Sequence, residues 1–200
     1  MSGKTSVILR AAGAIGATLA VVGGVTYAQV NGNVVTLTDN TISTSSTNSA
    51  LKISKRNTNF RQTINGFDFT GLTPGSRSTS NAETFFLRNT GNSDLAVDMY
   101  VPSLPTWTVT PSGTVDNSRV RLNVLCNISG GGTLSSTSPG NELTTLNTAP
   151  GETLTGTLGA HETATCSVNV TMAANAVSNP SATSVTSSGF DVEFTGTSTI

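Results

Sequence analysis

Two cysteines and one histidine are the side chains in this sequence best suited to chemistry. Cys126 and Cys166 each lie in phase with the apolar residues of an alternating segment, so both are expected to point into the core. A buried thiol is a poor nucleophile. A disulfide between them is the predicted state outside the cell, and two buried free thiols are the alternative.

His161 and Glu162 match the first half of the zinc-protease motif His-Glu-x-x-His, but Thr165 occupies the place of the second histidine. A serine hydrolase would need His161 as its base, and no Gly-x-Ser-x-Gly turn accompanies it. Asp and Glu are scattered singly, without an Asp-x-Asp-x-Asp calcium loop. We therefore expect a non-enzymatic protein without catalytic residues, metal or cofactor. A zinc site built from His161 and carboxylates is the alternative.

The N-terminus has the pattern of a secretion signal. Lys4 and Arg10 precede about fifteen residues of Ala, Gly, Val, Ile and Leu, which is short for a membrane span. Small residues before Gln29 predict cleavage after Ala28, so residues 1–28 are interpreted as a signal peptide. An uncleaved anchor is the alternative. The prediction is a secreted or cell-surface protein that touches the membrane only through the signal peptide.

Residues 29–200 are enough for one domain with a core of its own. Of the ten Lys and Arg, Lys4 and Arg10 fall within the signal peptide, and eleven Asp and Glu leave this part with a net charge near −3. Nucleic acid is not an expected partner, because phosphate binding needs a concentrated basic surface.

Ser, Thr and Asn make up roughly two fifths of the sequence, and apolar residues alternate with polar ones along several segments. This pattern is typical of half-buried antiparallel strands. The clearest segments are 95–101, 120–126, 166–172 and 190–194; further strands are expected at 34–38, 50–54, 67–70, 84–88, 107–109 and 153–158.

Turns rich in Pro, Gly and Asn separate these segments. The sequence therefore predicts an all-β fold, an antiparallel two-sheet sandwich of the jelly-roll or immunoglobulin-like kind. Residues 130–147, rich in Gly, Ser and Thr, are expected to form a flexible loop. Only residues 172–177 are expected to make a helical turn.

Three stretches resemble the TasA and camelysin family of secreted bacterial proteins. They are Gly23–Ala28 leading into Asn40–Thr44 and Leu51–Ser54, then Phe85–Gly91 with its Asn-Thr-Gly turn, and finally Val170–Ala176 followed by Phe190–Thr195. The resemblance implies a jelly-roll sandwich and, for the TasA-like branch, extracellular biofilm-matrix fibres in which the N-terminal strand of one copy completes the sheet of the next.

The segment 29–49 suits such a donor strand or N-terminal arm. Its apolar residues follow the cleavage site and stand among polar residues without Lys or Arg: Val30, Val34, Val35, Leu37 and Ile42. An ordinary edge strand within its own domain is the alternative. Deletion of residues 30–42 is expected to abolish polymers and to spare the folded monomer.

The leading hypothesis is a structural matrix or surface protein whose partner is itself, with other matrix or cell-surface components as further partners. The second is a monomeric secreted binding module that uses loops such as 130–147 and the region of Trp107. A camelysin-like metallopeptidase is the third, for which the sequence offers no ligand set.

Overall fold

The computed structural model describes residues 34–44 and 50–199. The predicted signal peptide, its cleavage site between Ala28 and Gln29, and Val30 lie outside the described residues.

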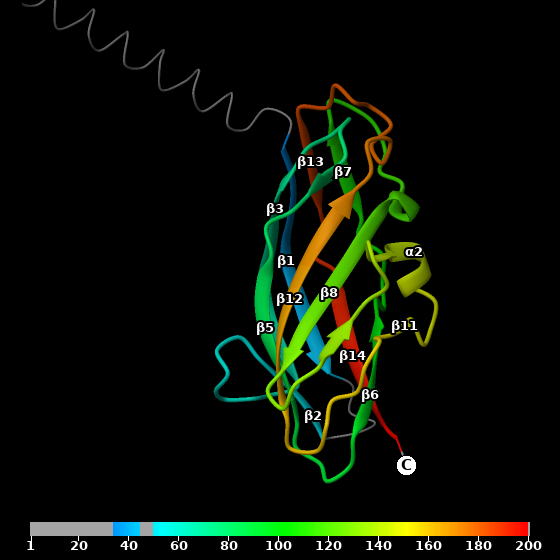
Figure 1. The fold of residues 1–200 in the computed structure, drawn as a ribbon. Helices are drawn as coiled ribbons and strands as arrows, with labels where there is room; N and C mark the ends of the chain where they lie inside the picture. Colours follow the sequence, from blue (N-terminus) through cyan, green and yellow to red (C-terminus); the bar gives the residue numbers. More distant parts are fainter. Residues whose placement is uncertain (1–33, 45–49, 200) are drawn as a thin grey trace, which may run out of the picture. The chain divides into compact units, whose positions relative to one another are not determined.

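The described chain forms two sheets of seven strands each that pack face to face, which confirms the all-β sandwich (Figure 1). In order of pairing, the first sheet contains β11 (Glu152–Thr153), β6 (Leu95–Tyr100), β14 (Asp191–Ser198), β1 (Val34–Thr44), β13 (Ser184–Ser187) and β7 (Trp107–Thr110), with β3 (Thr63–Leu72) also paired to β1.

The second sheet runs in the order β10 (Asn141–Glu142), β8 (Val120–Ile128), β12 (Thr163–Met172), β5 (Glu83–Asn89) and β2 (Leu51–Ser54). Two short strands extend it, β4 (Ser78–Thr79) beside β12 and β9 (Thr133–Ser135) beside β8. The helical elements are the 3-10 turn η1 (Asn117–Arg119) and the single-turn helix α2 (Leu143–Leu146).

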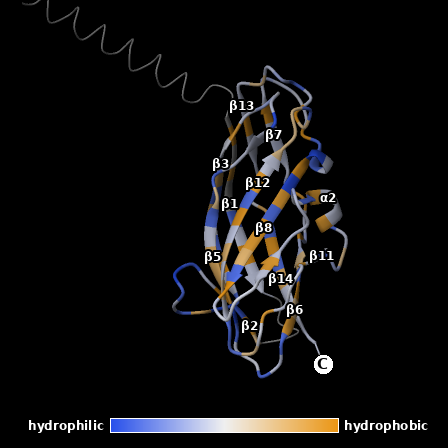
Figure 2. Ribbon diagram, viewed as in Figure 1, coloured by the Kyte–Doolittle hydropathy of each residue, from blue (hydrophilic) through white to orange (hydrophobic). Residues whose placement is uncertain are grey.

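Alternation places one face of each main strand in the core. Residues of β6, β8 and β12 alternate between buried and partly or fully exposed, and Figure 2 shows the corresponding change between apolar and polar residues along β8 and β12. The four clearest predicted segments are therefore confirmed as strands. The sheets are antiparallel except where β1 runs parallel to β13 and β14.

Phenylalanines join the two sheets. The Phe85 ring from the second sheet contacts Phe67 of β3 at 6.3 Å and Phe194 of β14 at 5.5 Å between ring centroids. On the first sheet, Phe69 stacks on Phe190 at 6.5 Å. Such aromatic pairs add stabilisation beyond the area they bury.

The segment 130–147 is not the loop that its composition predicts. It forms β9, β10 and α2, and Leu134, Leu143 and Leu146 are fully buried. Three leucines spaced along a hydrophilic segment bury enough apolar surface to fix it against the core.

Three smaller expectations are also corrected. Residues 172–177 form the end of β12 and a turn, with no helix. Of the expected strand 153–158, only Thr153 belongs to β11 (Glu152–Thr153), and isolated bridges follow at Thr155 and Leu158. Strand β13 is not among the expected strands, because its residues Ser184–Ser187 have the composition of a turn.

Candidate functional site

The predicted assembly strand β1 lies in the interior of the first sheet. It pairs with β3 along one edge and, along the other, first with β13 and then with β14. Val35, Leu37 and Ile42 are each at most 1% exposed. The backbone of Val34 belongs to the strand, and nothing is described of its side chain. The alternative of an ordinary edge strand within its own domain is therefore correct about the domain and wrong about the edge, since both edges of β1 are hydrogen-bonded to strands of the same chain.

The core position of β1 corrects the expectation for its deletion. Burying a Val, Leu or Ile side chain contributes about 1.5–3 kcal/mol, and a domain has only about 5–15 kcal/mol of net stability. Removal of residues 30–42 would take Val35, Leu37 and Ile42 out of the core. The monomer is not expected to fold after this deletion.

Asn40 joins β1 to β3 and to the segment between β13 and β14. It is 1% exposed, and its Nδ2 donates to the backbone oxygens of Phe67 (2.7 Å) and Leu37 (3.1 Å). Its Oδ1 accepts a hydrogen bond from the backbone N–H of Phe190 at 3.2 Å. The register with β3 shifts on either side of Asn40, so these bonds satisfy the backbone groups that an irregular pairing leaves free.

Sequence reasoning missed Asn40, although a signal was present. Leu37 and Ile42 are both buried but lie five residues apart, which a regular strand of period two does not allow. A bulge between them restores the inward direction of Ile42.

Cys126 and Cys166 form a disulfide, as predicted, between directly opposite positions of β8 and β12. Both residues are buried, so the bond lies on the core side of the second sheet. The loop that it closes spans 40 positions of sequence.

The Asn-Thr-Gly turn, one of the stretches that carry the family resemblance, has a structural role here. The fully buried Asn89 donates to the backbone oxygens of Ser93, Leu158 and Gly159 and accepts from the N–H of Gly91. Its side chain thus ties the end of β5 to the segment that precedes β12.

His161 is exposed in the turn before β12, in the left-handed backbone region with φ of 62°. The neighbouring Glu162 accepts a hydrogen bond from the N–H of Gly159 at 2.9 Å. Within residues 34–44 and 50–199, no three His, Cys, Asp or Glu side chains gather in a group that could hold a metal ion.

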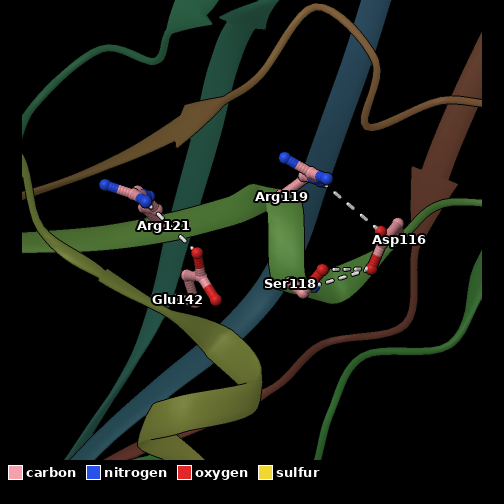
Figure 3. Close-up of polar contacts among 5 residues, drawn as sticks. All are labelled: Asp116, Ser118, Arg119, Arg121 and Glu142. Carbon is pink, nitrogen blue, oxygen red and sulfur yellow. Dashed lines mark hydrogen bonds and ion pairs between the residues drawn. The ribbon is translucent and has the colours of Figure 1, made fainter.

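Arg77, Arg119 and Arg121 line a cavity of about 320 Å³, named here the arginine cavity. Figure 3 shows that two of them face carboxylates: Arg121 contacts Glu142 at 3.1 Å, and Arg119 contacts Asp116 at 3.8 Å. Because these carboxylates offset most of the positive charge, the cavity is a weak candidate for binding anions.

Asp116 caps the 3-10 turn η1. Its pKa lies below the usual value, chiefly because the Ser118 hydroxyl donates a hydrogen bond to the carboxylate at 2.7 Å. The Ser118 backbone N–H donates a second bond at 2.9 Å, and the positive charge of Arg119 lowers the pKa further. Both effects favour the ionised carboxylate.

Comparison with protein-family models and with curated proteins found no match to this chain. Among the residues that the structure describes, no helix is long and apolar enough to cross a membrane.

Proposed function

We propose that this chain is an exported structural protein that assembles into fibres at the cell exterior by passing β1 to the sheet of a neighbouring copy. The observation that carries the proposal is the place of β1. Every strand that pairs with β1 follows it in sequence. Residues 63–72 and 184–194 supply the pairing partners on either side of β1, and the position between them is named here the β1 slot.

A second copy offers the same β1 residues to the β1 slot, so exchange between copies keeps the pairings and the buried contacts of the monomer. When each copy gives its strand to the next, the contact is head to tail, and the assembly can extend as a fibre without closing into a ring. Export is supported by the charged and apolar N-terminus, and a core disulfide is typical of proteins outside the cytosol.

An engineered disulfide tests strand exchange without removing β1 from the core. Ser43 and Thr63 lie directly opposite on the antiparallel strands β1 and β3, and neither is buried. In the double variant Ser43→Cys/Thr63→Cys, the disulfide should lock β1 in its own domain. We expect the oxidised variant to stay monomeric in electron microscopy and sedimentation under conditions in which the wild type forms fibres.

The matched control carries a disulfide that leaves β1 free. Ala96 and Thr197 lie opposite on β6 and β14, also antiparallel and outside the core. The variant Ala96→Cys/Thr197→Cys should form fibres as the wild type does. Fibres of the locked Ser43–Thr63 variant at the wild-type rate would refute strand exchange.

A monomeric secreted binding module is the second candidate. It is favoured by the complete pairing of β1 within one copy and by the basic residues around the loop between β2 and β3. The loops expected from the sequence to bind are less suitable: the Trp107 indole donates to Asn117 at 2.7 Å, and the leucines of 130–147 face the core. A chain that sediments as a monomer at all concentrations would favour this candidate.

A further inference from the structure

Five of the eight Lys and Arg in the described residues lie around one loop and the strands beside it. This basic cluster consists of Lys52, Lys55, Arg56, Arg61 and Arg88. The loop between β2 and β3 extends away from the two sheets in Figure 1 and is largely hydrophilic in Figure 2. Four of these residues lie within positions 52–61 of the sequence, although the net charge of residues 29–200 is negative, and the fold adds Arg88 to them.

The cluster contains a like-charge pair. Lys52 and Arg88 lie directly opposite on β2 and β5, on the face of the sheet turned away from the core. Like charges in this arrangement destabilise a sheet. The ion pairs of Arg119 with Asp116 and of Arg121 with Glu142 lie outside the basic cluster.

Aromatic rings and the backbone hold two of the cations in place. Lys55 lies 4.4 Å from the centroid of Phe67 and donates to the backbone oxygen of Gly66 at 2.6 Å. The Arg88 guanidinium lies 5.7 Å from the centroid of Phe60. Such contacts orient a cation and leave its charge available to an anion.

The cations share a cavity with neutral hydrogen-bonding groups. Lys55, Arg56 and Arg61 line an open cavity of about 280 Å³ together with hydroxyl and amide side chains from the loop and the start of β3, namely Ser54, Thr58, Asn59, Thr63 and Asn65. Within the loop, the Ser54 hydroxyl donates to the Thr58 oxygen and accepts from the Arg56 N–H.

We propose that the basic cluster binds an acidic polysaccharide, with the cations on its carboxylates and the neutral side chains on its hydroxyls. A uronic acid unit carries one carboxylate beside several hydroxyls, which matches a cavity lined by both kinds of group. A nucleic acid fits less well, because single strands bind by stacking bases on free aromatic faces. Here Phe67 is buried, and cations lie over both Phe67 and Phe60.

The test measures binding of the purified protein to polygalacturonate, with neutral dextran and single-stranded DNA as comparison polymers, by biolayer interferometry. We expect polygalacturonate to bind and dextran not to bind. Affinity should fall as salt rises, because the contacts are exposed charges. The variant Arg56→Gln/Arg61→Gln should bind on the order of tenfold more weakly, since exposed ion pairs are each modest.

The matched control removes two positive charges from the arginine cavity. Arg77→Gln/Arg119→Gln has the same net charge as the cluster variant and should bind within about twofold of the wild type. An equal loss in both variants would show that only net charge matters and would overturn the site. Tighter binding of DNA than of polygalacturonate, abolished in the cluster variant, would overturn the assignment to a polysaccharide.

This inference goes beyond fibre assembly and does not rest on it. Binding is measured on the Ser43–Thr63 locked chain as well as on the wild type, and the locked chain should bind each polymer as a monomer. Loss of binding in the presence of normal fibres refutes the polysaccharide site only. Fibres of the locked chain with normal binding refute strand exchange only.

Discussion

The Oδ1 atom of Asn40 accepts a hydrogen bond from the backbone N–H of Phe190, 150 positions later in the sequence, at 3.2 Å. This bond fixes the N-terminal strand to the point where its parallel partner changes from β13 to β14. The proposed donor strand thus contains a polar anchor among apolar residues.

Asn40→Ala should destabilise the domain by about 1–3 kcal/mol, because it removes the buried side-chain partner of the Phe190 N–H and of the Leu37 and Phe67 carbonyl oxygens. Urea unfolding followed by fluorescence or circular dichroism measures the change. Asn65→Ala on β3 is the matched control, since Asn65 is exposed, and should change stability by less than about 0.5 kcal/mol. Equal effects of the two substitutions would contradict the anchoring role.

The Cys126–Cys166 disulfide should protect both thiols and raise stability. Mass spectrometry after alkylation without reductant should show no added label, and reduction should lower the free energy of unfolding by about 4 kcal/mol in the loop-entropy model for 40 positions. Two alkylated cysteines in the unreduced native protein would contradict the bond.

Alanine substitutions at Gly151 and Gly131 distinguish the cost of a steric clash from the cost of backbone strain. Both glycines have positive φ, 84° at Gly151 and 100° at Gly131. A Cβ added at Gly151 would lie 2.0 Å from the Met99 carbonyl oxygen, whereas a Cβ added at Gly131 would have no atom within 4 Å. Gly131→Ala should cost about 1–2 kcal/mol from φ alone. Gly151→Ala should cost at least about 3 kcal/mol, because it also pushes β11 from β6. Thermal unfolding of both variants checks the order.

Asp116 should titrate below its usual pKa of 3.8. Because the folded state favours the ionised carboxylate, its stabilising contribution is present at neutral pH and is lost as the pH falls below 3.8 through the folded pKa. Carboxyl NMR titration measures the value directly. Ser118→Ala removes the hydroxyl donor and should bring the pKa back toward 3.8, and a pKa unchanged by this substitution would contradict the assigned cause.

The sequence by itself determined the sandwich and its main strands, because alternation is a local property. Val120, Leu122, Val124 and Cys126 point to one face in any strand that contains them, whatever its partners are. The same phase predicted that both cysteines point into the core, which is where their disulfide lies.

Local composition was misleading in segments where a few buried apolar residues determine the structure although most residues are polar. Leu134, Leu143 and Leu146 fix a segment that its Gly, Ser and Thr content marks as a loop, and Val185 secures β13 among serines and threonines. A single buried apolar side chain can hold a short strand when neighbouring strands supply the hydrogen bonds.

Only the tertiary structure decided the environment of β1 and the place of Arg88 in the basic cluster. The parallel pairing of Ile42 with Val192 and the opposition of Lys52 and Arg88 join residues far apart in sequence. No local pattern encodes such pairs, because strand partners are selected by the packing of the whole core and alternation fixes only which face is buried.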